Sequence, residues 1–320
     1  MVTNKTIKDA IEKGRSQAKS VIAFRDRALK SRAAAIRNLP SPLPPRRAFK
    51  APGVEDKAFA SLRRSLGPMP RGVLVAEGDS WFDYPFFDIL RCLEDLHGYD
   101  VESVAHKGDT VEEMAYGDGQ LEEFTRRIEK VLRNGLVPRA ILLSGGGNDI
   151  AGNEFGMLLN HAASSIAGLN RAVMDGVIDE RLKVAYVTII SKVTSVCERR
   201  IGRTLPIVVH GYDYLVPDGR GFLGGWWLLP GPWLEPGFRV KGFKQLKERI
   251  DLATKLIDRF NEMLKEVSRI GSFGHVHYID LRNTLSKKAN YKADWCNELH
   301  PTRKGFEKVT DKFAGIIKTF

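Results

Sequence analysis

The residues best suited to chemistry in this sequence are Ser80 and His300, a nucleophile and a base. A serine hydroxyl attacks poorly until a base takes its proton, and the tetrahedral intermediate then needs hydrogen-bond donors for its oxyanion. Ser80 follows an unbroken apolar run, residues 73–76, and a short turn that contains Gly78. Such a run predicts a strand buried on both faces of a parallel sheet, and open α/β sheets bind ligands at the carboxyl ends of their strands. Ser80 is therefore the candidate nucleophile.

Three later segments contain the other candidate residues of the site. Gly108 comes after a second apolar run, and its backbone N–H can approach an oxyanion closely because glycine has no side chain. Asn148 comes after a third run, in Ser144-Gly145-Gly146-Gly147-Asn148-Asp149. His300 lies near the end of the chain, before a predicted helix over 303–320. These segments supply oxyanion donors and a general base.

Four blocks of this chain resemble those of the GDSL or SGNH hydrolase family. They are Gly78-Asp79-Ser80-Trp81, the segment with Gly108, the Gly-x-Asn-Asp pattern at Asn148, and the Asp-x-x-His-Pro pattern at His300. The resemblance spans residue 73 to about residue 318. It implies a serine hydrolase that cleaves carboxylic esters, a lipase, esterase or acylhydrolase, through an acyl-enzyme. It also implies an oxyanion hole made by Ser80, Gly108 and Asn148.

The chain departs from the family pattern three residues before the histidine, where Asn297 replaces the usual aspartate. An amide oxygen can accept the imidazole N–H, but it cannot offset the charge of the imidazolium. Three interpretations remain open: Asp294 supplies a carboxylate from a neighbouring turn, Asn297 orients the ring, or Glu298 does so. Glu298 is the least favoured because its neighbour Leu299 suggests that it points elsewhere.

Other polar residues are assigned lesser roles. His106 and His210 can line the site but are expected to be packed or hydrogen-bonded residues. His275 and His277 form an i, i+2 pair without a third ligand nearby, so no metal is expected. The Gly145–Gly147 run is not followed by Gly-Lys-Ser/Thr, which argues against a nucleotide loop. The sequence predicts no cofactor.

The elements that must position these residues alternate between strands and helices. Such alternation predicts a three-layer α/β/α sandwich around a five-stranded parallel sheet. The resemblance implies the flavodoxin-like strand order 2-1-3-4-5. The predicted strands are Val73–Glu77, Val101–Ala105, Ala140–Ser144, Ile207–Gly211 and Val276–Leu281. The predicted helices are Phe86–Leu96, Val111–Asn134, Glu180–Arg199 and Lys241–Ile270.

Two insertions are expected beside the site, at 150–178 and 218–237. The first is predicted to be a helical excursion. The second is rich in Trp, Leu, Gly and Pro and follows the fourth strand, so it is expected to emerge at the same edge as Ser80. Its aromatics either fold the loop onto the core or form an apolar acyl-binding wall or lid. The predicted substrate-binding residues are Trp226, Trp227, Trp233 and Tyr212.

The positive charge is concentrated before the first strand. The chain has 50 Lys and Arg residues and 39 Asp and Glu residues. Residues 1–72 hold 17 of the basic residues and 5 of the acidic ones, so the net charge of +11 comes from this leader. Residues 4–38 have the composition of one or two helices, and four prolines in 40–45 predict a stiff linker. We therefore divide the chain into a basic extension, 1–45, and a hydrolase domain, 46–320. The extension can bind an anionic membrane or an acidic partner, or be a solvated helix face; nucleic acid is not expected.

The sequence also bears on location and on rival functions. It has no apolar run of about 20 residues, no apolar signal core, and only Cys92, Cys197 and Cys296, which predicts a cytoplasmic protein. An acyltransferase or a deacetylase would use the same residues. A non-catalytic module would instead bind a membrane or nucleic acid through the basic extension.

Overall fold

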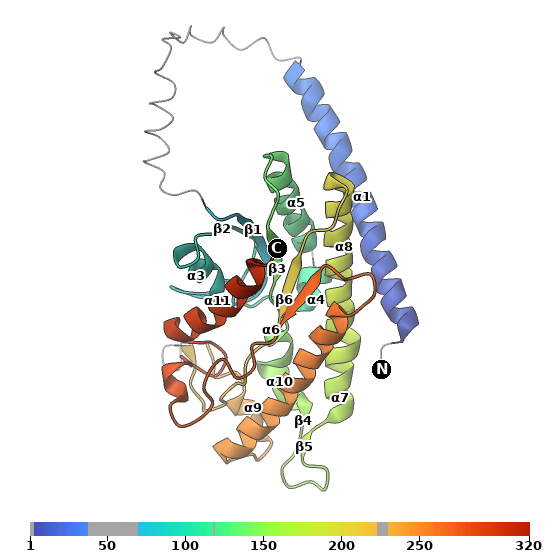
Figure 1. The fold of residues 1–320 in the computed structure, drawn as a ribbon. Coiled ribbons are helices and arrows are strands. Elements are labelled where there is room, and N and C mark those ends of the chain that lie inside the picture. The colour runs from blue at the N-terminus through green and yellow to red at the C-terminus, as the bar shows by residue number, and fades with distance from the viewer. Residues whose placement is uncertain (1–2, 38–69, 118, 223–229) are drawn as a thin grey trace.

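The computed structural model describes residues 3–37, 70–117, 119–222 and 230–320. Within them the chain forms a five-stranded parallel sheet with helices on both faces (Figure 1). In spatial order the strands are β2 (Asp100–Ser103), β1 (Val73–Glu77), β3 (Ala140–Leu143), β6 (Ile207–His210) and β7 (Val276–Ile279). Counted within this sheet, the order is 2-1-3-4-5. The predicted fold class is confirmed.

The strand β1 lies inside the sheet and is buried along its whole length. Val75 pairs with Glu102 on one side and with Ile141 on the other. Its apolar side chains have no solvent-facing side, which explains the run without alternation. Because the sheet is parallel, the loops that follow β1, β3 and β6 all leave at one edge.

The helices divide between the two faces of the sheet, as Figure 1 shows. On one face lie α3 (Ile89–Asp95) and α11 (Arg303–Ile317). On the other face lie α4 (Val111–Tyr116), α5 (Gln120–Arg133), α8 (Lys183–Ile201) and α10 (Leu246–Ser268). One hydrophobic core joins both faces.

Several of the predicted helix boundaries differ from the observed ones. The helix predicted over 111–134 is two helices, because Gly117 ends α4 and Gly119 adopts a left-handed φ of +86° before α5. The helix predicted from Phe86 begins at Ile89, where the Asp88 side chain caps it. The helix predicted from Lys241 begins at Leu246.

The two predicted insertions differ in how fully they are described. The first contains a 3₁₀ turn (Asn153–Leu158), an antiparallel pair of β4 (Leu159–Asn160) and β5 (Gly168–Leu169), α7 (Arg171–Asp175) and a π-helical turn (Gly176–Leu182). It is therefore less helical than predicted. The second ends in α9 (Glu235–Val240). Its residues 223–229, with Trp226 and Trp227, lie outside the described part of the chain.

The basic segment forms one helix, α1 (Asn4–Arg37), that lies along α8 (Figure 1). A Cβ on Gly14 would come within 2.7 Å of the Thr188 carbonyl oxygen, so glycine allows the close approach of the two helices. Ala18 and Ile22 are buried in the same contact. The Pro-rich linker, 40–45, lies outside the described residues. The division at residue 45 stays a prediction.

Polar contacts also attach α1 to the main body. The Arg25 guanidinium binds the Glu129 carboxylate and lies 3.3 Å from Thr125 Oγ1, both on α5. Arg200 on α8 binds the same carboxylate at 2.7 Å. The Glu129 side chain is 5% exposed and forms ion pairs with both guanidinium groups.

We expect Arg25→Ala to lower the free energy of unfolding by about 1–3 kcal/mol, because it leaves a buried carboxylate with one fewer partner. Chemical denaturation measures the change. Arg15 is an exposed residue on the same helix, and Arg15→Ala is expected to change stability by less than about 0.5 kcal/mol. Equal losses in the two variants would show that the Arg25 contact does not stabilise the docking of α1.

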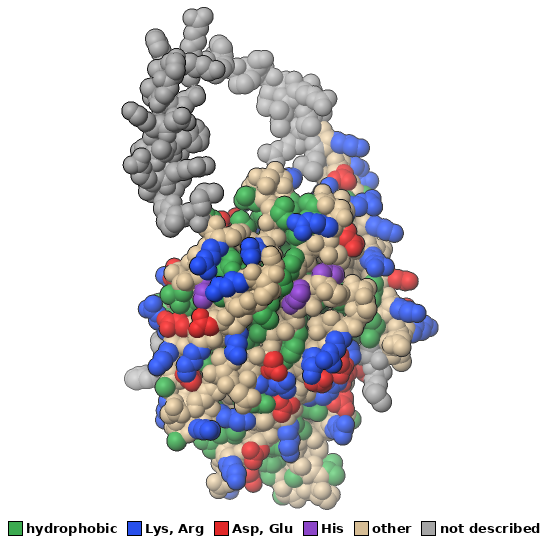
Figure 2. All heavy atoms as spheres, in the orientation of Figure 1, with side chains coloured by type: hydrophobic (Ala, Val, Ile, Leu, Met, Phe, Trp, Pro, Cys, Tyr) green, Lys and Arg blue, Asp and Glu red, His purple; other side chains and the backbone are tan. Residues whose placement is uncertain are grey.

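The outward side of α1 carries exposed cations (Figure 2). They include Lys5, Lys8, Arg15 and Lys19. Binding of an anionic membrane or an acidic partner by this side stays a prediction. Of the helices in the described ranges, none has the length and apolar character needed to cross a bilayer.

Candidate active site

The candidate nucleophile Ser80 lies in a tight turn directly after β1. The N–H groups of Phe82 and Asp83 both donate to the Asp79 carbonyl, at 3.0 and 3.1 Å. A Cβ on Gly78 would lie 2.7 Å from the Ser144 Cβ, so only glycine lets the turn pack against the end of β3. The turn holds Ser80, half-buried, at the carboxyl edge of the sheet.

The structure brings His300 to Ser80 across 220 residues. His300 Nε2 lies 2.8 Å from Ser80 Oγ, and the histidine is 5% exposed. Two hydrogen bonds hold the loop that carries it. The Cys296 N–H donates to the His300 carbonyl at 2.9 Å, and Trp81 Nε1 donates to the Leu299 carbonyl at 3.1 Å. The last contact ties the histidine loop to the nucleophile's own turn.

Asn297 is the residue that contacts the other ring nitrogen. Asn297 Oδ1 lies 3.0 Å from His300 Nδ1 and also accepts the backbone N–H groups of His300, at 2.9 Å, and Leu299, at 3.0 Å. Because a backbone N–H can only donate, the amide oxygen must face these groups. The imidazole therefore carries its proton on Nδ1, and Nε2 is free to accept the proton of Ser80.

The other two candidates for the partner of His300 have different partners. The Asp294 carboxylate accepts from Lys308 Nζ at 2.7 Å and from the Ser286 N–H at 2.9 Å. Burial raises the pKa of Asp294, but these hydrogen bonds outweigh it and leave the pKa below its usual value. The structure thus contradicts the interpretation that Asp294 orients the ring, because its carboxylate is turned toward α11.

Glu298 binds the second insertion instead of the histidine. Its carboxylate accepts the backbone N–H groups of Gly219, Trp233 and Leu234 at 2.8 to 2.9 Å, and that of Glu235 at 3.1 Å. Burial raises the pKa of Glu298, and the same hydrogen bonds lower it in part. Glu298 is the anchor that attaches the insertion to the histidine loop.

Asn148 and Gly108, the predicted oxyanion donors, differ in their relation to Ser80. Asn148 lies on the short helix α6 (Gly147–Ile150) and lines the same cavity as Ser80. One of its amide hydrogens binds the Asp109 carbonyl at 2.9 Å, which leaves the other available. Gly108 has a left-handed φ of +97° and is exposed, outside the cavity lining.

The loop that carries Gly108 is nevertheless fastened to the nucleophile's turn. The His106 N–H donates to the Gly78 carbonyl at 2.9 Å. The Lys107 N–H donates to Asp83 Oδ2 at 3.1 Å. These two bonds place the loop beside Ser80. The role of Gly108 as an oxyanion donor stays a prediction.

A buried polar network below Ser80 was missed by the sequence analysis, which gave Asp79 and Ser144 no role. Asp79 Oδ1 accepts from Ser144 Oγ at 2.8 Å and from the Trp81 N–H at 3.0 Å. Ser144 Oγ also lies 2.8 Å from His210 Nε2. His210 Nδ1 lies 3.0 Å from the Gly211 carbonyl. His210 is therefore a buried, hydrogen-bonded residue, as expected.

Burial lowers the pKa of His210, and its hydrogen bond to the Gly211 carbonyl raises that pKa in part. The neutral form of the His210 ring is therefore favoured, which suits a fully buried site.

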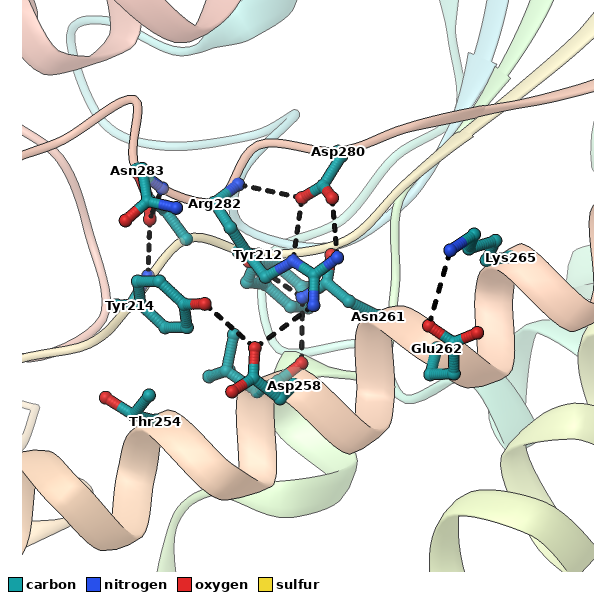
Figure 3. A network of polar contacts seen from close by, with 12 residues as sticks. Tyr212, Tyr214, Thr254, Asp258, Asn261, Glu262, Lys265, Asp280, Arg282 and Asn283 are labelled. Atoms are coloured by element: carbon teal, nitrogen blue, oxygen red, sulfur yellow. Dashed lines mark hydrogen bonds and ion pairs between the residues drawn. The ribbon is translucent and has the colours of Figure 1, made fainter.

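Tyr212, a predicted substrate-binding residue, lines the cavity but its hydroxyl is already engaged. It donates to Asp79 Oδ2 and accepts the Gly147 N–H at 3.0 Å. Asn261 on α10 donates to the Tyr212 carbonyl at 3.0 Å (Figure 3). A Cβ on Gly211 would lie 1.8 Å from Asn261 Oδ1. The role of Tyr212 in substrate binding stays a prediction.

The loop after β7 is attached to the same helix. Arg282 binds Asp258 at 3.0 Å and Asp280 at 2.8 Å, and Tyr214 Oη donates to Asp258 at 2.8 Å (Figure 3). The network joins the segments after β6 and β7 to α10. It holds the segment that leads toward the histidine loop.

The cavity beside Ser80 is narrow and largely apolar. The volume within it that the centre of a water molecule can occupy is about 20 Å³, which is enough for about one water molecule. The polar residues in its lining include Ser80, Asn148 and His300. Its apolar wall includes Ile150, Leu215, Leu234, Leu256, Ile257 and Leu299. Leu234 comes from the second insertion, and an acyl-binding role for this insertion stays a prediction.

Of the predicted tryptophans, Trp233 is the one described, and it lies against the histidine. Its ring meets the His300 ring edge to face, with centroids 5.4 Å apart. Trp226 and Trp227 lie outside the described residues, so their role in binding stays a prediction. Among the described residues, no group of three His, Cys, Asp or Glu side chains is arranged to hold a metal ion.

The burial of His300 predicts activity at acid pH. A base accepts a proton only when it is neutral, and burial lowers the pKa of His300 to about 3. We expect kcat/KM for an ester to stay within about twofold from pH 8 to pH 5. A histidine with the ordinary pKa of about 6.5 would lose about 30-fold at pH 5, and that result would contradict the expectation. The unfolded chain protonates below pH 6.5, so stability falls in this range and circular dichroism must confirm folding.

No protein-family model matches the sequence, and no curated protein matches it. Solved structures with a similar architecture include an extracellular lipase from Streptomyces rimosus, with 14% identity and a TM-score of 0.44, covering 78% of this chain and 99% of that one.

Two further solved structures are similar in the same way. A catalytic mutant of an acetylxylan esterase from Geobacillus stearothermophilus has 13% identity and a TM-score of 0.39, covering 78% of this chain and 95% of that one. A proposed SGNH hydrolase from Slackia heliotrinireducens has 12% identity and a TM-score of 0.39, covering 76% of this chain and 97% of that one.

Proposed function

We propose that this protein is a serine hydrolase that cleaves carboxylic esters through an acyl-enzyme on Ser80. The observation that carries the proposal is the 2.8 Å contact between His300 Nε2 and Ser80 Oγ, with the ring held by Asn297 in the tautomer that leaves Nε2 free. A nucleophile, a base and a group that orients the base are the three parts that acyl transfer requires.

In the first half of the reaction, Ser80 Oγ attacks the ester carbonyl carbon while its proton moves to His300 Nε2. The carbonyl oxygen becomes an oxyanion, which the Ser80 N–H and the available Asn148 amide hydrogen can bind, with the Gly108 N–H as the third predicted donor. His300 then gives the proton to the alkoxide, which leaves as an alcohol. The acyl group remains on Ser80.

In the second half, water takes the place of the alcohol. His300 Nε2 accepts a proton from the water, whose oxygen attacks the acyl carbon and forms a second oxyanion at the same donors. Collapse of this intermediate returns the proton to Ser80 and releases the carboxylic acid. Asn297 keeps its bond to Nδ1 throughout, so the ring does not turn between the two halves.

The narrow cavity supports a substrate whose group next to Ser80 is small and apolar. Its walls are leucine and isoleucine side chains, and its free space is that of about one water molecule. An acetyl group needs the least displacement of these walls. A long acyl chain would require them to move.

The experiment that tests the proposal combines turnover with labelling. We expect hydrolysis of p-nitrophenyl acetate to be at least about tenfold faster, in kcat/KM, than hydrolysis of the octanoate. A fluorophosphonate probe followed by peptide mass spectrometry is expected to label Ser80. No turnover and no label would contradict the hydrolase. A preference for the octanoate would contradict only the assignment of the small group.

Loss of the Asn148 amide is expected to lower kcat by about 10²–10³-fold, because an oxyanion donor acts mainly in the transition state. KM is expected to change by less than about threefold in Asn148→Ala. Thermal unfolding of the variant controls for the lost bond to the Asp109 carbonyl. A decrease in kcat of less than about threefold in a well-folded variant would exclude this donor.

A further inference from the structure

The amide at position 297 leaves the base without a charged partner. His300 must become an imidazolium in each half of the proposed reaction, and Asn297 offers it a neutral oxygen. Among the described residues, no acidic side chain forms a hydrogen bond or an ion pair with His300. Burial alone accounts for the lowering of the His300 pKa to about 3. Some other group must reduce the cost of this charge.

The acidic groups nearest to the histidine are turned toward other partners. Asp79 lines the same cavity but binds Ser144, Tyr212 and the Trp81 N–H. Glu298, on the histidine's own loop, binds backbone N–H groups of the second insertion. The hydroxyl of Tyr84, in the loop after β1, belongs to a ring that contacts His300, and the Cys296 thiol lies near this hydroxyl.

Tyr84 contacts both His300 and Asn297. Its ring stacks on the His300 ring with centroids 4.2 Å apart and planes inclined by 22°. Its hydroxyl accepts a hydrogen bond from Asn297 Nδ2 at 3.0 Å. Tyr84 is 7% exposed and does not line the cavity beside Ser80.

Each contact favours the protonated histidine. The face of an aromatic ring carries negative charge and attracts a cation stacked on it, more strongly when water is excluded. Donation by Asn297 Nδ2 polarises the amide and makes its oxygen a stronger acceptor for Nδ1–H. The Tyr84 hydroxyl also pairs an amide group that would otherwise be buried without a partner.

We infer that Tyr84 is a positioning residue that, together with Asn297, takes the place of the missing carboxylate: its ring face stabilises the imidazolium and its hydroxyl anchors the amide. The inference rests on the proposed function, because it concerns the base of that reaction. It requires that replacing Tyr84 lower kcat by a smaller factor when residue 297 carries a carboxylate.

A double-mutant cycle with Asn297→Asp tests this dependence. Tyr84→Leu removes the ring face, and we expect kcat for p-nitrophenyl acetate to fall at least 30-fold with KM within twofold. In the Asn297→Asp background the same change is expected to cost less than fivefold. Tyr84→Phe keeps the ring and loses the hydroxyl. We expect it to lower kcat three- to tenfold in the wild-type background and less than twofold in the Asn297→Asp background. Tyr116→Leu, a change at an exposed tyrosine on α4, is expected to leave kcat within twofold.

Equal losses in the two backgrounds would show that Tyr84 is merely structural and would overturn the inference. If Tyr84→Leu does not fold, the comparison of Tyr84→Phe in the two backgrounds decides. A rise in KM with unchanged kcat would place Tyr84 in substrate binding and would also overturn it.

A titration of His300 by NMR separates this inference from the proposed function, because it needs no turnover. With ¹⁵N-labelled histidine, and His300→Gln to assign the signals, we expect the wild type to show the Nδ1–H tautomer at neutral pH. Asn297→Asp is expected to raise the pKa of His300 by more than one unit. Adding Tyr84→Leu to that variant is expected to lower the pKa of His300 again, by at least 0.5, because the ring face is lost. An Nε2–H tautomer in the wild type would overturn the inference even if the enzyme is active. So would a pKa of His300 that none of these substitutions changes.

Discussion

Replacement of Ser80 with alanine is expected to lower kcat for p-nitrophenyl acetate by at least about 10⁴-fold, because no acyl-enzyme can then form. Residual hydrolysis would come from the oxyanion donors and from binding alone. The half-buried Ser80 side chain meets His300 but supports no other described contact, so the fold is expected to survive the change. Turnover at equal folded concentration measures the effect.

The control for this result is Ser20→Ala, the same chemical change at an exposed position on α1. It is expected to leave kcat within about twofold, since exposed sites away from the chemistry have small effects. The fluorophosphonate probe is expected to label the control and not the Ser80 variant. Activity above 1% of wild type in Ser80→Ala, with the label on another serine, would place the nucleophile elsewhere.

Replacement of His300 with alanine is expected to lower kcat by a similar factor, about 10⁴ or more, because Ser80 then has no base. The double variant Ser80→Ala with His300→Ala is expected to be no slower than either single variant, since the two residues act as one unit. The rate of fluorophosphonate labelling at Ser80 measures the loss of activation directly.

Added imidazole offers a second measurement on the histidine variant. The space that the ring leaves is bounded by Tyr84 and Trp233, both aromatic, and we expect imidazole to enter it and restore part of the labelling rate. His161→Ala, a change at an exposed histidine of the β4–β5 hairpin, is expected to keep kcat within about twofold. Normal turnover in His300→Ala would contradict the assignment of the base.

These expectations concern residues whose chemistry was predictable but whose partners were not. Four apolar residues followed by a Gly-Asp-Ser turn predicted a buried strand ending at Ser80, and the strand lies there in β1. The alternation of strands and helices predicted the layered sheet, and strand order followed from the resemblance. Such local patterns are readable because strand burial and turn geometry depend mainly on neighbouring residues.

The identity of the histidine's partner depended on the direction of side chains in one loop. Asp294, Asn297 and Glu298 all lie within six residues of His300, and the sequence left the choice among them open. The structure separates them because Lys308 on α11 binds Asp294 and the second insertion binds Glu298. Lys308 lies 14 positions after Asp294, and Gly219 lies 79 positions before Glu298, so each partner belongs to another element of the fold.

The same reason explains what the sequence did not indicate at all. Tyr84 stacks on a histidine 216 positions later. Asp79 meets Ser144 and Tyr212, which follow other strands, and Ser144 in turn meets His210. The sequence by itself determined the strands, the turn at Ser80 and the candidate nucleophile and base, because those follow from local pattern and residue type. Only the tertiary structure decided which polar groups face one another, because packing of helices and loops against the sheet sets those distances.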